Sequence, residues 1–279
     1  MNRVAKIIAG SLTAMILLTD CHDKNATSPF DEIVSKQPYA SLTDSIKKEP
    51  GRDDLFFRRA VLLNKNNLPE PALADFQKAW LLKKEERYAF GISNLLLDKK
   101  PDSAILFLKG ALKELPNSLL LQLTLARGYD AQNKLDEALK ICDDILAKNP
   151  KQADVLKMKA DLLDRKGDQQ EAIRVLEKVY LLTPFDINLN YSLADKYSGT
   201  NNPKVVHLCD SLIKMDSLHI HPEPYYFKGI YYSNINEKAR AFDLFDEAIR
   251  HDYHFLNAYI EKGRIQFDEK KYIEALKTF

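Results

Sequence analysis

The stretch KLDEALKICDDILAKNP, residues 134–150, decides the fold of this chain. It places Cys142 beside two aspartates, a combination that could belong to a chemical site, and it ends in a proline. Its apolar residues recur at intervals of three and four, however, which is typical of one face of an amphipathic helix. Pro150 ends that helix, because proline lacks an amide donor and disfavours the helical conformation in the residue before it. The stretch is therefore interpreted as a helix and its terminator.

The same pattern recurs roughly every 34 residues. One position is held by Ala72, Ala104, Ala138, Ala172, Val205, Ala241 and Ala275. A larger apolar residue follows four positions later: Phe76, Leu108, Cys142, Leu176, Cys209, Phe245 and Phe279. A second series is small: Ala60, Gly91, Ala126, Ala160, Ala194, Gly229 and Gly263. Each period therefore holds two helices that approach closely at their small residues. Because one such pair buries little apolar surface, neighbouring pairs must stack to complete a core.

This pattern resembles the tetratricopeptide repeat (TPR) family. The best-matching groups are Ala126, Tyr129, Ala138 and Pro150; Gly229, Tyr232, Ala241, Phe245 and Ala248; and Tyr259, Gly263, Ala275 and Phe279. The sequence departs from the family pattern where Val205 replaces the alanine, and where Lys84 and Tyr253 replace the closing proline. The resemblance implies an all-α fold, a right-handed superhelical solenoid of antiparallel helix pairs with about six full repeats and a partial repeat at each end.

The predicted solenoid covers residues 38–279. Its predicted parts are a capping helix at 38–52 and repeats at 53–85, 86–118, 119–152, 153–186, 187–221, 222–255 and, in part, 256–279. The chain stops at Phe279 within an expected helix, which would leave an apolar face exposed. The natural protein is therefore expected to continue beyond this residue.

The first twenty residues are predicted to be an export signal. Arg3 and Lys6 precede a twelve-residue apolar run at 7–18, which is too short to span a bilayer but fits the core of a signal peptide. LLTDC (17–21) resembles a bacterial lipobox, from which Asp20 departs because a small residue is usual there. We expect a signal peptide at 1–20, a lipid on Cys21 and a flexible linker at 21–37. Simple cleavage and an uncleaved anchor remain alternatives.

These features predict an exported protein of the bacterial cell envelope, anchored by its lipid at the outer membrane or at the periplasmic face. Once residues 1–20 are removed, basic and acidic residues are equal in number, so no electrostatic surface for nucleic acid is expected.

The sequence contains no motif that predicts catalysis. A nucleophile elbow, a Walker loop, a G-x-G-x-x-G and an H-E-x-x-H are all missing from it. The pairs His219 with His221 and His251 with His254 do not make a zinc site, which needs three or four ligands at fixed geometry. Cys142 and Cys209 fill an apolar core position, and Asp143 and Asp144 are expected to face solvent. We expect no catalytic residue, metal, cofactor, small-molecule substrate or disulfide.

The resemblance implies that the first helices of successive repeats line a concave groove. One predicted row of inward-facing residues is Phe57, Tyr88, Leu123, Lys157, Tyr191, Tyr226 and Ile260; a second is Val61, Ile92, Arg127, Asp161, Asp195, Ile230 and Arg264. Aromatic side chains beside polar groups are common in binding hot spots. The predicted partner-binding residues are Tyr191, Tyr226, Asn188, Asp195, Asn234, Arg127 and Lys157. The alternative is that the tyrosines pack between helices.

Some TPR proteins hold the terminal carboxylate of a peptide with a lysine, asparagine and arginine clamp. Here Asp161 stands where the clamp asparagine would be, so that specificity is not expected. The chain is predicted to be a non-catalytic scaffold or adaptor that binds a peptide or helix of a protein partner in the groove. Two alternatives are a structural subunit that uses the edges or ends of the solenoid, and a regulatory region of a larger enzyme that continues beyond residue 279.

Overall fold

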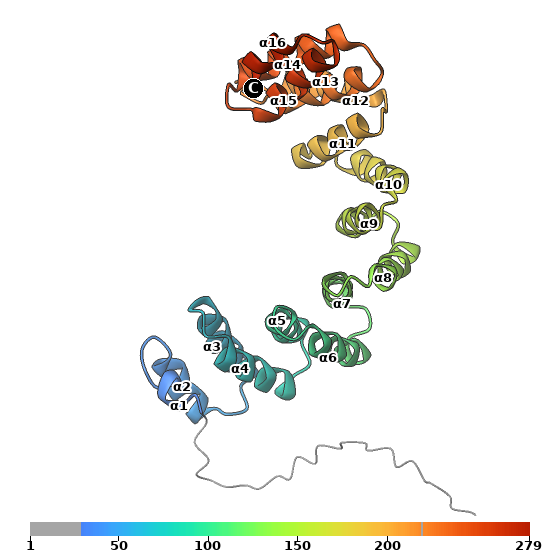
Figure 1. Cartoon of the computed structure of the whole chain (residues 1–279). Coiled ribbons are helices and arrows are strands. Elements are labelled where there is room, and N and C mark those ends of the chain that lie inside the picture. The colour runs from blue at the N-terminus through green and yellow to red at the C-terminus, as the bar shows by residue number, and fades with distance from the viewer. Residues whose placement is uncertain (1–28, 219) are drawn as a thin grey trace, which may run out of the picture.

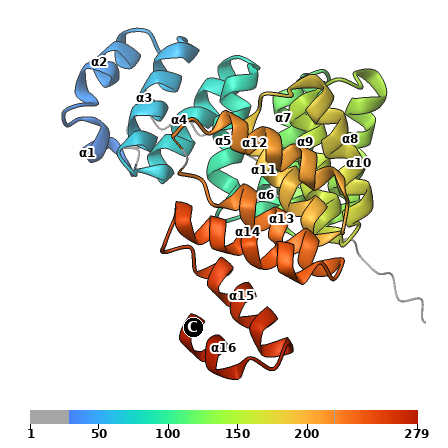
Figure 2. The same ribbon diagram turned by 90° about the horizontal axis from the view of Figure 1, so that it is seen from above.

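The computed structural model describes residues 29–218 and 220–279. Over these residues the chain forms sixteen α-helices and no strand. The helices stack as antiparallel pairs along an open arc (Figure 1). In the view of Figure 2, the α13–α16 end is displaced out of the plane of that arc, which gives it the pitch of a superhelix. The prediction of an all-α solenoid of helix pairs is confirmed. The predicted export signal and Cys21 lie outside the described residues.

Seven helix pairs follow one another along the chain. Their first helices are α3 (Asp53–Lys65), α5 (Glu86–Leu97), α7 (Leu119–Ala131), α9 (Ala153–Lys166), α11 (Ile187–Gly199), α13 (Glu223–Asn234) and α15 (Leu256–Asp268). Their second helices are α4 (Pro69–Leu82), α6 (Pro101–Glu114), α8 (Leu135–Lys148), α10 (Gln169–Leu182), α12 (Lys204–Met215), α14 (Lys238–His251) and α16 (Tyr272–Thr278). Each pair lies within one of the predicted repeats. Among the described helices, none combines the length and the apolar character needed to cross a bilayer.

The series of small residues lies where helices touch. Ala60, Ala126, Ala160 and Ala194 have no exposed surface. A Cβ built on Gly229 would lie 2.5 Å from the ring of Phe245, closer than real carbon atoms approach. A Cβ on Gly91 would lie 2.8 Å from the ring of Phe76. Gly91 and Gly229 stay small because an aromatic ring from the second-helix series already occupies the space.

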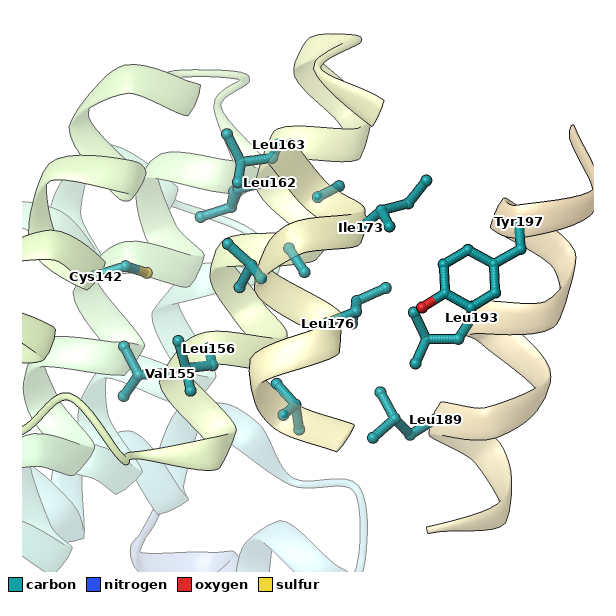
Figure 3. Packing of buried hydrophobic residues seen from close by; sticks show 14 of the residues in the cluster. Cys142, Val155, Leu156, Leu162, Leu163, Ile173, Leu176, Leu189, Leu193 and Tyr197 are labelled. Atoms are coloured by element: carbon teal, nitrogen blue, oxygen red, sulfur yellow. The ribbon is translucent and has the colours of Figure 1, made fainter. Parts of the chain in front are cut away.

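Both cysteines of the repeated apolar position are core residues. Cys142 and Cys209 are free thiols with 0% exposure, so their predicted structural role is confirmed. Burial raises the pKa of Cys142 to about 11 and that of Cys209 to about 12, because the interior disfavours a thiolate. Figure 3 shows Cys142 in the same packed layer as Val155, Leu156 and Leu162 of α9. Asp143 and Asp144, in contrast, are exposed as predicted.

The turns between repeats use proline and an amide together. Pro116 and Pro184 follow the ends of α6 and α10. Gln122 donates its side-chain Nε2 hydrogen bond to the carbonyl of Pro116 at 2.8 Å, and Asn190 donates from Nδ2 to the carbonyl of Pro184 at 3.0 Å. The next first helix thereby binds the turn that precedes it, which fixes the angle between successive repeats.

A Lys–Asp ion pair recurs between successive repeats. The lysine precedes the small residue of a first helix, and the aspartate follows the large apolar residue of the preceding second helix. Lys159 Nζ lies 2.6 Å from Asp143 Oδ1, and equivalent pairs join Lys228 to Asp210 and Lys262 to Asp246. The sequence alone did not suggest this ion pair. Its two residues can nevertheless be found at fixed positions, next to the small residue of one series and the large apolar residue of the other.

The amino-terminal end is closed by α1 (Asp31–Val34) and α2 (Ala40–Lys48). Val34 is buried, and its carbonyl accepts a 2.6 Å hydrogen bond from Thr43 Oγ1 on α2. The prediction of a flexible linker up to residue 37 is therefore wrong for residues 31–34, because an apolar side chain there finds a packing surface. Thr43 Oγ1 also accepts from Arg59, whose guanidinium binds both carboxylate oxygens of Asp75 at 2.6 and 2.7 Å.

Candidate functional site

The inner side of the arc is lined by first helices. In Figure 1, α7, α9 and α11 lie inside the arc and α6, α8 and α10 lie outside it. This follows from the pairing: each second helix covers the outer side of its own first helix, which leaves one face of the first helix open. The residues on that open face come from positions 120, 123 and 127 of α7 and from their equivalents one repeat later.

The described part of the inner surface contains a hollow of about 530 Å³ between α7 and α9. Leu120, Leu123 and Met158 form an apolar floor, and Leu123 and Met158 also pack against the central core. Charged side chains surround this floor: Arg127, Asp130, Asp154, Lys157, Asp161 and Arg165. An apolar centre with a polar rim is common at protein–protein interfaces.

Several charges near the hollow are already paired. Lys157 Nζ lies 2.6 Å from Asp186 Oδ2, and Lys196 Nζ lies 2.7 Å from Asp164 Oδ1. Arg165 pairs with Asp130 across the two helices. The hydrogen bond from Lys157 lowers the pKa of Asp186, because it favours the charged carboxylate. Lys157 is therefore partly engaged in holding α9 to the start of α11.

Other charges on the inner surface have no such partner. Within the described residues, no ion pair or side-chain hydrogen bond involves the charged groups of Arg127, Asp161 or Asp195, and all three residues are exposed. Partial burial raises the pKa of Asp161, because desolvation disfavours its charged form and outweighs the attraction of Lys196. These three groups are free to meet charges on a partner.

The structure places Tyr191 and Tyr226 in different surroundings. Tyr191 is half-buried on α11, with its ring centroid 6.1 Å from that of His221, and burial raises its pKa to about 12. Tyr226 on α13 packs against Phe245 and Phe255, at centroid distances of 5.9 and 5.3 Å. Much of the Tyr226 ring therefore belongs to the packing between helices, which was the alternative interpretation.

The two predicted asparagines lie at opposite ends of their helices. Asn188 is exposed in the first turn of α11. Asn234 is the last residue of α13, and its Nδ2 donates to the carbonyl of Ser198 at 3.3 Å. Of the predicted residues, Arg127 and Lys157 line one hollow, whereas Asn234 lies at the turn between α13 and α14. The sequence analysis did not single out Leu120, Met158 or Asp154, which line the same hollow.

The predicted inward-facing rows are wrong for Tyr88 and Ile92, which have 0% exposure. The Tyr88 ring packs 5.1 Å from that of Phe57, and its hydroxyl donates to Asp53 at 2.5 Å. Burial raises the pKa of Tyr88 to about 12. At this end of the solenoid, large side chains from α3 and α5 fill the inner surface themselves.

A second exposed surface lies on three successive loops between repeats. We call it the apolar loop edge: Leu181, Phe185, Leu218, Tyr253 and Leu256, which are 70% to 84% exposed. Ring contacts connect successive repeats near this edge, since Tyr191 on α11 lies beside His221, and Tyr225 on α13 stacks on His251 at the end of α14 at 4.6 Å. The described residues contain no group of three or more His, Cys, Asp or Glu placed to hold a metal. His219 lies outside the described residues.

Comparisons with known proteins agree with this architecture. Residues 95–162 and 153–186 match models described as tetratricopeptide repeat. A tetratricopeptide repeat protein from Parabacteroides merdae has a similar structure at 14% identity, covering 81% of this chain and 90% of that chain with a TM-score of 0.55. The C-terminal part of a TPR repeat-containing protein from Cytophaga hutchinsonii is similar at 14% identity, covering 78% and 91% with a TM-score of 0.66. No curated protein matches the sequence. At this identity the likeness is one of fold.

Proposed function

Because the chain is a tetratricopeptide repeat protein, we propose that it is a non-catalytic scaffold that binds a peptide segment or helix of a protein partner in its concave groove. Proteins of this family mediate protein–protein interactions. The observation that carries the proposal is the hollow between α7 and α9, where an apolar floor lies beside Arg127 and Asp161, which form no ion pair within the described residues. A partner side chain buried there would gain apolar contact and an ion pair together.

The test compares two double variants that each remove one cation and one carboxylate. Arg127→Ala with Asp161→Ala alters the groove, and Lys140→Ala with Asp144→Ala alters an exposed ion pair on the outer helix α8. Partners are recovered by affinity purification from native membranes and quantified. The groove variant should recover its main partner at least tenfold less well than the wild type, and the α8 variant should recover it normally. Unchanged recovery by the groove variant would eliminate the groove as the binding site.

Tyr226 is a poor choice for this test. Its ring packs against Phe245 and Phe255, so Tyr226→Ala would loosen the repeat as well as the groove. Arg127 and Asp161 are exposed, and circular dichroism should show that their replacement leaves the fold intact.

We also propose that the protein is exported to a bacterial envelope and held there by a lipid on Cys21. The support is the sequence pattern of residues 1–21, a basic start followed by a short apolar run and a cysteine. Cells fed an alkyne fatty acid should label the wild-type protein, and Cys21→Ala should abolish the label while Cys142→Ala keeps it. An unlabelled wild type would contradict the anchor.

The apolar loop edge favours a second candidate function, a structural subunit of an envelope assembly. Leu181, Phe185 and Leu218 are each more than 70% exposed, and large exposed apolar patches often mark contact surfaces. Phe185→Ser with Leu218→Ser should abolish co-purification if this edge makes the contact. The same variant should leave partner recovery unchanged if the groove makes it.

A further inference from the structure

The unpaired charges of the groove occupy one repeated position. Arg127, Asp161 and Asp195 each follow the small residue of a first helix, so they form one row across α7, α9 and α11. All three are exposed, and no described residue forms an ion pair with them. The sign of the row changes from positive on α7 to negative on α9 and α11.

Neighbouring charges do not cancel this change of sign. The nearby cations each form an ion pair with a carboxylate other than Asp161 or Asp195. The pairs are Lys157 with Asp186, Arg165 with Asp130, and Lys196 with Asp164. The row therefore presents one free cation and two free carboxylates to whatever enters the groove. Charges beside an apolar floor act more strongly than charges in open water, because less solvent screens them.

Apolar side chains line the same hollow as the two signs of charge. Leu123 on α7 and Met158 on α9 lie in the hollow that Arg127 and Asp161 border. Both are partly buried, so an apolar side chain of a ligand could rest on them without displacing the core. Methionine adapts its shape to such contacts.

We propose that the groove selects peptide segments with a defined order of charge: an acidic side chain over α7, an apolar side chain over the Leu123–Met158 floor, and basic side chains over α9 and α11. This inference rests on the proposed function, because it names the class of peptide that the groove accepts. The helices α7, α9 and α11 follow one another along the inner side of the arc, so the acidic position lies at one end of the bound segment and the basic positions lie towards the other end. A terminal carboxylate is disfavoured beside Asp161 and Asp195.

A displayed library of random dodecapeptides tests this order. Wild-type protein should enrich peptides with an acidic residue at one end of the motif, two basic residues towards the other end and an apolar residue between the two signs. Asp161→Lys with Asp195→Lys should instead enrich peptides with acidic residues at the two basic positions. The matched control is Glu114→Lys with Glu137→Lys, which makes the same change in net charge at exposed positions of α6 and α8 and should enrich the wild-type set.

The most enriched peptide is then measured by fluorescence polarisation. Its dissociation constant should rise at least tenfold for the Asp161→Lys, Asp195→Lys variant, and it should rise with added salt for the wild type. The enriched peptides could lack any charge order and yet lose binding in the Arg127→Ala, Asp161→Ala variant. That result would overturn this inference and leave the groove proposal standing. Enriched peptides indifferent to both groove variants, or no enrichment at all, would overturn the groove proposal and this inference with it.

Discussion

At the scale of single residues, the contact between Gly229 and Phe245 decides how closely α13 and α14 pack. Phe245 is fully buried, so its ring cannot swing aside to make room for a side chain. A methyl group at position 229 would lie within 2.5 Å of that ring. The glycine is therefore required for packing, not for backbone freedom.

Gly229→Ala should lower the free energy of unfolding by about 1–3 kcal/mol, the usual cost of overpacking a core. Gly110→Ala is the matched control, because Gly110 also lies within a helix but has no atom within 4 Å of the added carbon. It should raise the free energy of unfolding by about 0.5–1 kcal/mol through helix propensity. Urea denaturation measures both changes. A neutral or stabilising Gly229→Ala would show that the ring moves freely.

Asp186 performs two tasks at the start of α11. Its carboxylate accepts the backbone N–H of Leu189 at 3.2 Å and binds Lys157 on α9. Asp168 caps α10 in the same way, through the N–H of Glu171, and has no lysine partner at its carboxylate. Replacing each aspartate in turn therefore distinguishes the contribution of the helix cap to stability from that of the ion pair.

Asp168→Ala should lower the free energy of unfolding by about 1 kcal/mol, the usual contribution of a cap. Asp186→Ala should cost up to about 1 kcal/mol more, from the half-buried pair with Lys157. Asp186→Asn keeps the cap and removes only the charge. Because the pKa of Asp186 is lowered in the folded state, its charge stabilises the protein above about pH 4 and that stabilisation is lost as the pH falls further. The difference between wild type and Asp186→Asn should shrink below pH 4 in urea titrations.

The sequence predicted the repeated small and large positions, including Cys142 and Cys209, because their burial depends only on the helix pair that contains them. It did not predict that Tyr88 is buried while Leu123, at the equivalent position, lines a hollow. That difference depends on the size of neighbouring side chains from other repeats. Phe57 fills the inner surface beside Tyr88. Such contacts are not visible in the periodicity of one helix.

At the scale of secondary-structure elements, one buried ion pair attaches the capping helix α2 to the first repeat. Arg59 on α3 binds Asp75 on α4 and Thr43 on α2, and all three residues are buried. Burial raises the pKa of Asp75, and the guanidinium of Arg59 opposes that rise. The sequence predicted α2 from the spacing of its apolar residues. It gave no sign of the network, because Arg59 and Asp75 look like ordinary surface charges on two helices.

Arg59→Ala should lower the free energy of unfolding by about 3–5 kcal/mol, because it leaves the carboxylate of Asp75 buried without a partner. Arg59→Met with Asp75→Leu should recover most of this loss, since it removes both charges and keeps the volume. The fluorescence of Trp80, the single tryptophan of the chain, follows unfolding of this same repeat. A double variant as unstable as Arg59→Ala would indicate that the pair itself, and not the orphaned carboxylate, supplies the stability.

At the scale of the whole molecule, the core is divided along the solenoid. One cluster of buried residues runs from α1 to α7, a second from α7 to α12, and a smaller third one lies in α14 and α15. In the last helices, Phe267, Ile273 and Leu276 are mostly exposed. Repeats that contact only their neighbours unfold in parts when the contacts differ in strength.

Hydrogen exchange should therefore be fastest in α15 and α16 and slowest in α8 to α10. The urea transition followed by Trp80 fluorescence, which reports the first repeat, should not coincide with the transition followed by circular dichroism. Coincident transitions and uniform exchange would show that the chain unfolds as one cooperative unit. The sequence predicted the number of repeats and their order, but the division of the core depends on which large side chains meet across repeats.

The repeated Lys–Asp pair has a consequence for how such a chain can grow. In the repeat at 222–255, Lys228 pairs with an aspartate of the preceding repeat, and Asp246 pairs with a lysine of the following repeat. A second copy inserted directly behind the first would place its own lysine opposite the aspartate of the original, so the new junction would carry the same Lys–Asp pair as the existing ones. Duplication of this segment of the gene would thus lengthen the solenoid while keeping this ion pair at the join.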